Sequence, residues 1–385
     1  MKVFFRNIHL YLGLCAGLVI MTTCFTGAAL VFEKELQTAI YPERYKVQPT
    51  GAKVSLERMI SMLKAEVPGA KVSSAKVYDD PARSVELSYS IPEKENENGQ
   101  AFMNPYTGKL ISLYKYRNTF FYTMFALHRW LLAEDAGKLI VGISTSIFLF
   151  ILITGIILWW PKNKKKLKSS LRLKWGAGWK RVNHDLHVVI GFYAAIFLFA
   201  FAFTGLAWSF HWFNDGIYWV TGTESKRPDP PSSVFQADTE SISFDEALTA
   251  IQNQVSNATY YHLNAPRDSS GAFAVTILSN DPVHEKATDQ YFLDQYTADL
   301  LGTYLYRDRN LGQRVRSTFY PVHVGSIGGL PGRIIAFLSC IAGVTFPVTG
   351  IIMWINRLRK EKRKKKKKAV STSVHKKVVA HEGVY

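Results

Sequence analysis

The sequence predicts an α-helical integral membrane protein with four spanning helices from an internal duplication, together with two small α+β domains outside the membrane. Two observations carry this prediction. Four stretches of the 385 residues contain no Asp, Glu, Lys or Arg and are 22 to 25 residues long, namely residues 8–32, 139–160, 188–210 and 334–355. A helix needs about 20 apolar residues to cross a bilayer. One pattern of histidine and glycine also occurs twice along the chain, and such a repeat indicates the architecture.

The first part of the repeated pattern lies in the first and third apolar stretches. His9 precedes Gly13 by four residues, and an FTG motif ends eighteen residues after His9. His187 precedes Gly191 by four residues, and a second FTG motif ends eighteen residues after His187.

The second part of the pattern leads into the other two stretches. His128 lies nine residues before the glycine of GKLI and 27 before the glycine of TGIILW. His323 lies nine residues before the glycine of GRII and 27 before the glycine of TGIIMW. The chain therefore carries four histidines at matched positions, two in each copy.

The repeat divides the chain into eight segments. The expected bounds are 1–33 for the first spanning helix, 34–125 for the first outward domain, 126–160 for an interfacial segment with the second spanning helix, 161–183 for a basic loop, 184–212 for the third spanning helix, 213–322 for the second outward domain, 323–356 for the fourth spanning helix and 357–385 for a basic tail. The first helix is too long for the apolar part of a signal peptide and its repeat partner is internal, so we interpret it as retained.

The net charge of +17 is concentrated in the short connections. The N-terminus, the loop 161–183 and the tail after residue 356 hold 23 Lys and Arg but only Glu361 and Glu382, so the rest of the chain is slightly acidic. Basic connections lie on the cytoplasmic side of spanning helices and contact anionic lipid. We therefore expect both termini to be cytoplasmic and both long insertions to lie outside, with the bilayer rather than nucleic acid as the partner of the basic segments.

The two outward insertions have matching patterns of secondary structure. Each begins with a short amphipathic helix, after Ser55 and after Ser243, where SFDE has the form of a capping box. Alternating apolar segments then predict half-buried strands, such as VELSY at 85–89 and FAVTI at 273–277. Each copy closes on a hairpin-like stretch, FMNPYTGKL in the first and FLDQYTADL in the second. Two small α+β domains are the expected result.

This combination resembles the PepSY-associated transmembrane family. The resemblance extends from His9 to Asn356 and rests on the F-x-(N/D)-x-Tyr-Thr-x-x-Leu segments, the LHRW motif at 127–130 and the repeated Thr-Gly motifs. Within that family the chain is most similar to the bacterial inner-membrane ferric-siderophore reductases of the FoxB type, which carry b-type haem. The resemblance implies two haem b groups, periplasmic PepSY-like domains, and a ferric siderophore or other ferric chelate as substrate.

His9 and His187 are the expected axial ligands of an inner haem. Histidine is a common axial ligand of haem iron, and ionisable side chains at membrane depth are functional candidates. Gly13 and Gly191 lie one turn further along nearly the same helix face, where a flat macrocycle approaches the backbone. A two-fold axis between the copies would bring the two histidines together from opposite sides.

His128 and His323 are the expected ligands of an outer haem, by the same symmetry. The segments that carry them differ. Residues 120–132 predict an apolar interfacial helix, whereas residues 321–329, PVHVGSIGG, predict a less regular structure.

Three further residues break the symmetry between the copies. Arg6 and His184 occupy equivalent positions, and we interpret both as candidates for contacts to haem propionates, with His184 also an alternative ligand. His211, at the outer end of the third stretch, is an alternative outer ligand in place of His128 or His323.

Purely structural roles are the alternative for these residues. Interfacial histidines also hydrogen-bond to lipid headgroups and backbone carbonyls, although packing alone does not require four imidazoles at matched spacings. We interpret the Thr-Gly motifs primarily as small residues that pack spanning helices together. We interpret the three cysteines as packing residues in apolar helices.

The expected function is transfer of electrons across the membrane to a periplasmic ferric chelate, with release of Fe(II). The chain lacks a GxGxxG motif, so the electron donor is expected to be a separate cytoplasmic reductase or a quinol. One alternative is a membrane-anchored PepSY protein without redox chemistry that docks a partner or inhibits a peptidase. A metal transporter is a weaker alternative, because no Asp or Glu lies within the four apolar stretches.

Overall fold

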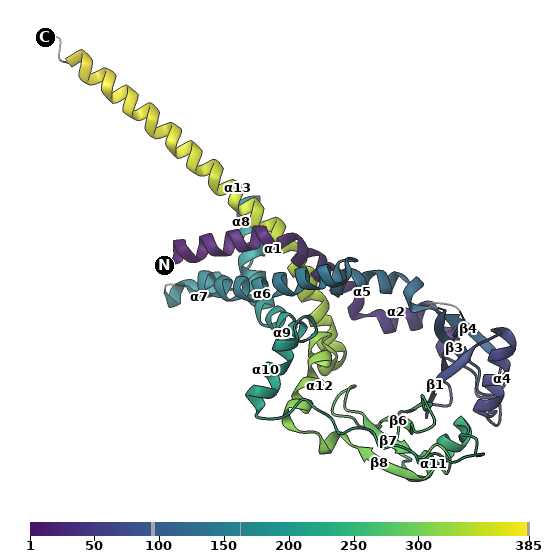
Figure 1. The fold of residues 1–385 in the computed structure, drawn as a ribbon. Coiled ribbons are helices and arrows are strands. Elements are labelled where there is room, and N and C mark those ends of the chain that lie inside the picture. The colour runs from purple at the N-terminus through teal and green to yellow at the C-terminus, as the bar shows by residue number, and fades with distance from the viewer. Residues whose placement is uncertain (94–96, 162, 383–385) are drawn as a thin grey trace. The chain divides into compact units, whose positions relative to one another are not determined.

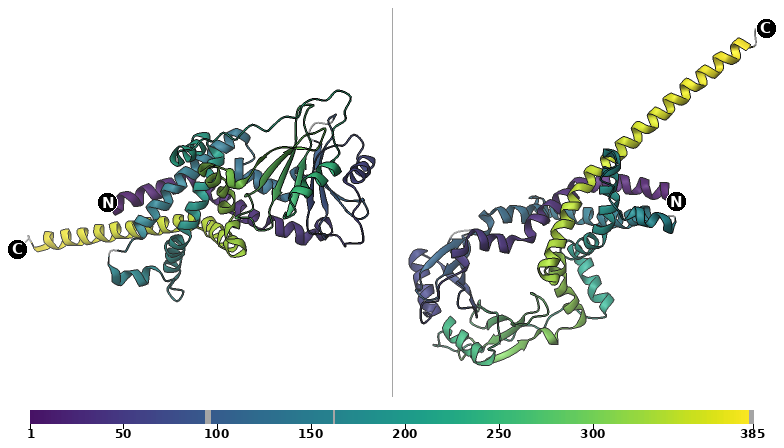
Figure 2. Two further views of the ribbon diagram at one scale, coloured as in Figure 1. Left: turned by 90° about the horizontal axis from the view of Figure 1, so that it is seen from below. Right: turned by 180° about the vertical axis from the view of Figure 1, so that it is seen from behind.

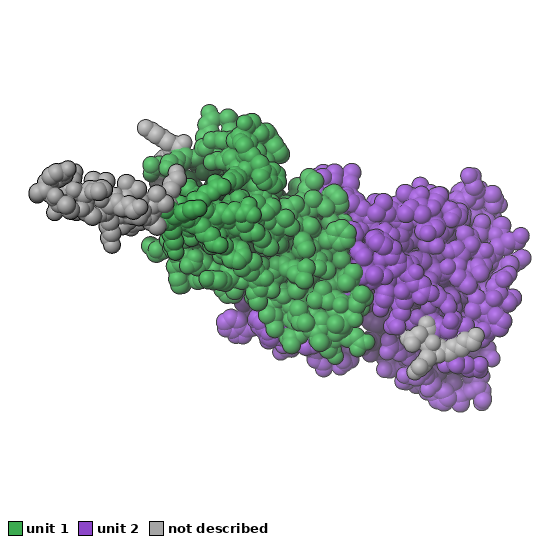
Figure 3. Space-filling view, turned by 90° about the horizontal axis from the view of Figure 1, so that it is seen from above, with its two compact units in different colours: residues 1–28, 127–209, 335–385 green, residues 29–126, 210–334 purple. Residues whose placement is uncertain are grey.

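The computed structural model describes residues 1–93, 97–161 and 163–382 (Figure 1). Residue 162 of the predicted basic loop, residues 94–96 of the first predicted domain and residues 383–385 of the predicted tail lie outside this description. The chain forms two compact units (Figure 3). The helical unit comprises residues 1–28, 127–209 and 335–385, and the sheet unit comprises residues 29–126 and 210–334.

Four helices are long and apolar enough to cross a membrane, and they coincide with the four predicted stretches. They are α1 (Lys2–Val31), α6 (Glu134–Trp159), the continuous run of α8 (Trp179–Asp185), η2 (Leu186–Ile190) and α9 (Gly191–Ser209), and α13 (Gly329–Glu382). The segment η2 is a π-helix. A single π-turn within an α-helix is frequent at functional sites, and this one contains His187.

The helical unit is packed through small and aliphatic side chains. Ala16 and Ile20 of α1, Leu152 of α6 and Leu198 of α9 belong to one buried apolar cluster. Small residues let spanning helices approach closely, as at Gly343, where an added Cβ would lie 2.6 Å from the sulfur of Cys24. The three cysteines are free thiols, of which Cys24 is buried, Cys340 is half-buried and Cys15 is exposed.

The two insertions share one eight-stranded antiparallel sheet, whereas the sequence predicted two separate domains. The strand order is β4-β3-β2-β1-β5-β6-β7-β8. Figures 1 and 2 show the sheet unit from three sides. The strands are β1 (Lys71–Tyr78), β2 (Val85–Ser90), β3 (Asn98–Met103), β4 (Leu110–Tyr114), β5 (Tyr260–Asn264), β6 (Phe273–Leu278), β7 (Asp289–Leu293) and β8 (Leu300–Tyr304). The segments predicted at 85–89 and 273–277 are β2 and β6. Pairing between β1 and β5 removes two exposed edges that separate sheets would have kept.

The junction between the halves of the sheet is the β1–β5 ladder. Its five residue pairs run from Ser74 opposite Asn264 to Tyr78 opposite Tyr260, and the central pair is Lys76 opposite His262. The halves also carry the same irregularity, a register shift between Phe102 and Met103 in β3 and between Phe292 and Leu293 in β7.

One face of the sheet is covered by α4 (Leu56–Glu66) and α11 (Phe244–Gln254), which contribute to a single core. That core takes alternate residues from the strands of both halves, such as Leu87 and Leu263, which are fully buried. The other face carries polar and aromatic side chains. The period-two alternation therefore separates a hydrophobic face from a polar one, as in other antiparallel sheets.

The N-termini of α4 and α11 bind each other. The carboxylate of Asp245 accepts hydrogen bonds from the backbone N–H groups of Leu56 (2.7 Å) and Glu57 (3.0 Å). In return, the carboxylate of Glu57 accepts one from the N–H of Phe244 at 2.9 Å. Ser243 closes the predicted capping box on α11. Each helix thus supplies the anion that the positive N-terminus of the other favours.

The shorter helices are α2 (Glu33–Ile40), α3 (Pro42–Tyr45), α5 (Phe120–Trp130), α7 (Lys164–Ser170), α10 (His211–Thr221) and α12 (Leu311–His323), with 3₁₀ turns η1 (Tyr116–Asn118), η3 (Tyr306–Asp308) and η4 (Ser326–Gly328). The predicted helix at 120–132 is present as α5. The prediction of less regular structure from residue 321 was wrong for its first three residues, because Pro321 to His323 form the last turn of α12. A capping box at Asn310 begins this helix.

We expect Asp245→Ala to lower the free energy of unfolding of the sheet unit by about 1–2 kcal/mol, because it leaves two helix N–H groups without their acceptor. Chemical denaturation of the purified protein, followed by tryptophan fluorescence, measures this change. Asp281→Asn, at an exposed loop carboxylate, is the control and should leave the unfolding midpoint in place. An unchanged midpoint in the Asp245 variant would show that the reciprocal capping contributes no stability.

Candidate functional site

Two of the four repeated histidines lie close together in the helical unit. The imidazole rings of His9 on α1 and His187 in η2 have centroids 6.2 Å apart and planes at 79°. Both side chains are only partly accessible. The structure therefore brings together the pair that the sequence predicted for the inner site.

Each of these imidazoles is anchored by a threonine on another spanning helix. The Nδ1 atom of His9 lies 3.0 Å from Oγ1 of Thr154 on α6. The Nδ1 atom of His187 lies 2.8 Å from Oγ1 of Thr349 on α13. Both threonines belong to Thr-Gly motifs that the sequence analysis assigned first to helix packing.

The threonine hydroxyls fix which ring nitrogen carries the proton. Thr154 donates its hydroxyl proton to the carbonyl of Phe150 at 2.9 Å, and Thr349 donates its own to the carbonyl of Thr345 at 2.9 Å. A hydroxyl has one proton to give, so we infer that each threonine oxygen accepts from the imidazole. Nδ1 is then the protonated nitrogen of both histidines, and Nε2 keeps its lone pair.

The glycine of each motif makes room for the same ring. A Cβ atom added at Gly155 would lie 3.4 Å from Cε1 of His9, and one added at Gly350 would lie 3.2 Å from Cε1 of His187. The Thr-Gly pair thus combines a hydrogen-bond acceptor with the space that the imidazole edge needs.

His128 is held in the same way at a second place in the helical unit. Its Nδ1 lies 2.9 Å from the carbonyl oxygen of Thr23 and 3.2 Å from Oγ1 of Thr26. A carbonyl oxygen can only accept, so this Nδ1 is protonated as well. A Cβ added at Gly27 would lie 3.2 Å from Cε1 of His128, which repeats the arrangement at the inner pair.

The centroid distance of the inner pair matches that of two imidazoles bound to one metal ion. A metal held between two opposed imidazole nitrogens, about 2 Å from each, places the ring centroids about 6 Å apart. Among the described residues, no group of three or more His, Cys, Asp and Glu side chains gathers as a metal site. Two imidazoles are too few for a bare ion, which takes three or four protein ligands. They are enough for haem, because the porphyrin supplies the other four nitrogens.

The remaining predicted inner residues are placed as follows. An added Cβ at Gly13 would meet no atom within 4 Å, whereas one at Gly191 would touch the ring of Phe346 at 4.0 Å. Arg6 is exposed. His184 is also exposed, and its Nδ1 lies 3.2 Å from the buried carboxylate of Asp185. Its contact with Asp185 sets His184 apart from the three histidines held by threonines.

His211 and His323 belong to the sheet unit. His211 is the first residue of α10 and is exposed, while His323 is the last residue of α12 and is half-buried. The pairing of His323 with His128 at an outer haem remains a prediction.

The sequence analysis missed the threonines as functional residues. A signal for them exists, because each of the four apolar stretches contains one Thr-Gly pair, at 26–27, 154–155, 204–205 and 349–350. Thr204 also donates to its own helix, at the carbonyl of Ala200. A packing motif needs only a small residue, so the constant threonine was the informative feature.

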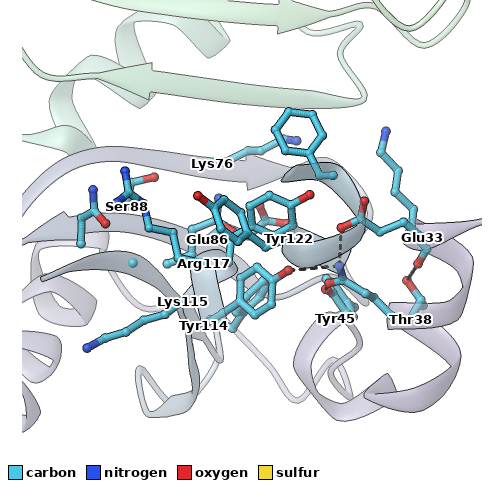
Figure 4. A pocket seen from close by; sticks show the side chains of 18 of the residues that line it. Glu33, Thr38, Tyr45, Lys76, Glu86, Ser88, Tyr114, Lys115, Arg117 and Tyr122 are labelled. Carbon is cyan, nitrogen blue, oxygen red and sulfur yellow. Dashed lines mark hydrogen bonds between the residues drawn. The ribbon is translucent and has the colours of Figure 1, made fainter. Parts of the chain in front are cut away.

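A second candidate site is a cavity of about 1320 Å³ in the sheet unit (Figure 4). Lys76, Glu86 and Ser88 line it from the polar face of the sheet, and Glu33 and Thr38 line it from α2. Eight tyrosines contribute to its wall: Tyr45, Tyr78, Tyr89, Tyr114, Tyr116, Tyr122, Tyr260 and Tyr320. Typical small-molecule sites occupy roughly 300–1,000 Å³, so this cavity is large enough for a bulky ligand.

Hydrogen bonds order the part of this cavity next to α2. Gln37 donates to Glu33 at 2.8 Å and to the hydroxyl of Tyr114 at 3.0 Å, and it accepts from the hydroxyl of Tyr45 at 2.7 Å. Burial raises the pKa of the Glu33 carboxyl above its usual value, while the Gln37 hydrogen bond and the nearby Lys34 act in the opposite direction.

The fold and these sites define a membrane protein with a four-helix spanning part and a β-sheet unit. The family model of the PepSY-associated TM region matches residues 6–357, so the chain belongs to the PepSY-associated transmembrane family. The match covers all the histidines and Thr-Gly motifs discussed above and confirms the family resemblance seen in the sequence. No curated protein matches the chain.

We expect the haem-free protein to hold His9, His128 and His187 as neutral imidazoles with the proton on Nδ1, the minor tautomer of free histidine. Nitrogen-15 NMR of histidine-labelled protein measures this state. Thr349→Val should release His187 from it. Thr145→Val is the matched control, because Thr145 donates to the carbonyl of Val141. Protonation on Nε2 in the unaltered protein would contradict the assignment.

Proposed function

We propose that the protein is a dihaem b electron carrier of a bacterial inner membrane, with both termini cytoplasmic and its sheet unit in the periplasm. It takes electrons from a quinol or a cytoplasmic reductase and reduces a ferric siderophore or another ferric chelate, and the Fe(II) so released enters iron uptake. The observation that carries this proposal is the pair His9 and His187, 6.2 Å apart between ring centroids, each held at Nδ1 by a threonine of another spanning helix.

The residues of the chain would do three things in this function. His9 and His187 would hold the inner haem, and His128 with His323 would hold the outer one. Thr154, Thr349 and Thr26 would orient the imidazoles, as outer-sphere partners of metal ligands do. Bound haem supplies the one-electron chemistry.

The alternative functions explain less of the helical unit. A membrane-anchored PepSY protein without redox chemistry would use the sheet unit, but it has no need for imidazoles fixed with Nε2 unprotonated. A metal transporter would need further ligands for a bare ion beside the two imidazoles, and the described residues gather no larger group of His, Cys, Asp and Glu.

A visible spectrum of the protein, purified from cells supplied with haem, tests the proposed function. We expect a Soret band, an α-band on reduction and about two haems per chain. A colourless preparation would rule out the electron carrier. Rapid mixing of the reduced protein with a ferric chelate should then reoxidise the haem.

We expect His9→Ala and His187→Ala each to remove the same haem, because the two imidazoles form one ligand pair. Pyridine haemochrome assay should show a fall from about two haems per chain to about one, with the same spectral component lost in both variants. His184→Ala is the control, since that ring contacts Asp185, and it should keep both haems. Loss of different haems in the two variants would refute the pairing.

Thr349→Val should raise the midpoint potential of the inner haem. Without the threonine oxygen as acceptor for its Nδ1–H, the imidazole of His187 is less basic at Nε2 and would donate less charge to iron, which favours the ferrous state. Potentiometric titration followed optically measures the shift. Thr349→Ser keeps the hydroxyl and should restore the original potential. Equal potentials in the valine and serine variants would count against a role for the hydroxyl.

A further inference from the structure

We propose that the cavity of the sheet unit binds an anionic, oxygen-rich ligand and that Lys76 is its charged anchor. This inference deepens the proposed function, because it makes the substrate an anionic ferric chelate rather than a neutral or cationic one. That the ligand contains Fe(III) rests on the proposed function, whereas the binding of an anion is argued from the cavity alone.

Most cations around the cavity already have a carboxylate partner. The ammonium of Lys34 lies 3.0 Å from Glu285, and that of Lys115 lies 2.8 Å from Glu97. Arg83 lies 3.5 Å from Glu86, and Arg333 contacts Glu35. These pairs leave little charge for a ligand to meet.

Lys76 differs from them, because no carboxylate of the described residues lies within 4.0 Å of its ammonium group. Instead it lies over two aromatic rings, 4.0 Å from the centroid of Tyr260 and 4.9 Å from that of Tyr78. Aromatic faces attract a cation but do not neutralise it.

Lys76 lines the cavity from the middle of the β1–β5 ladder. It projects from the β1–β5 junction, where it lies opposite His262, onto the polar face of the sheet. Burial lowers the pKa of the Lys76 ammonium, and the nearby Lys34, Arg83 and Lys286 lower it further, while Glu86 opposes them. The ammonium is therefore a partly buried charge without a carboxylate partner, and a bound anion would offset the cost of its burial.

Tyrosine hydroxyls supply neutral donors beside this charge. Tyr78 donates to Glu86 at 2.7 Å, but the hydroxyls of Tyr116 and Tyr260 make no hydrogen bond within the described parts of the chain. Phenolic O–H groups donate to anionic oxygens. A ligand that presents several oxygen atoms around a compact anionic centre would suit one ammonium group together with these two phenolic donors.

Gallium chelates test the proposal without electron transfer, since Ga(III) resembles Fe(III) in charge and size but is not reduced. Isothermal titration of the full chain in detergent compares a trianionic Ga(III) tris-catecholate with a neutral Ga(III) tris-hydroxamate. We expect the tris-catecholate to bind more tightly. Lys76→Gln should weaken that binding about 10- to 100-fold, as expected for loss of one charge-assisted hydrogen bond, and should change binding of the tris-hydroxamate little.

Two control variants complete the test. Lys76→Arg keeps the charge and should retain most of the affinity. Lys109→Gln removes an exposed lysine outside the cavity lining and should leave both affinities unchanged, which controls for the overall charge of the protein. The inference is overturned if neither chelate binds, if Lys76→Gln leaves the anionic chelate unaffected, or if it weakens both chelates equally.

The outcome is separable from that of the proposed function. A protein that lacks haem but binds the tris-catecholate through Lys76 would refute the electron carrier and leave the anion site standing. A haem-loaded protein that reduces a ferric chelate, with the Lys76→Gln variant binding both gallium chelates as before, would refute only the anion site.

Discussion

The hydrogen bond between a threonine hydroxyl and an imidazole Nδ1 is the interaction on which the helical unit depends for its chemistry. At His9 and His187 the threonine lies on a different spanning helix, and its proton is already committed to its own helix backbone. The bond therefore acts in one direction only. It ties two helices together and favours the tautomer in which Nε2 would be free to bind the proposed haem, so the same contact serves packing and the proposed function.

The sheet unit depends on a different constraint, the burial of one face and not the other. Because side chains alternate along each strand, the same strands that supply the apolar core under α4 and α11 supply Lys76 and the tyrosines on the opposite face. Reciprocal capping by Asp245 and Glu57 joins the helices of the two halves. The cavity is thus a product of joining the halves, since β1 and β5 both line it, through Lys76 and Tyr260.

Much of this was predictable from the sequence. The uncharged stretches identified the four spanning helices because length and composition are sufficient signals, and the spacing of His9 and His187 predicted their pairing. The joining of two expected domains was not predictable, because strand pairing across 186 residues leaves no local pattern. Lys76 was missed for a related reason: a lysine on a polar strand face looks solvated until the fold encloses it. The repeated threonines could be recognised in the sequence, but their role could not be assigned without the structure, which shows which imidazole each hydroxyl contacts.

The central position of Lys76 in the β1–β5 ladder has a consequence for how such a site can arise. Consider a homodimer in which two identical chains pair through the same antiparallel strand. The residue at the centre of that ladder would lie opposite the same residue of the other chain, so a lysine there would lie opposite a second lysine. A single chain escapes that restriction, and here the opposing residue is His262. Covalent linkage of the halves thus permits one asymmetric charge on an axis where a homodimer could place only a matched and mutually repelling pair.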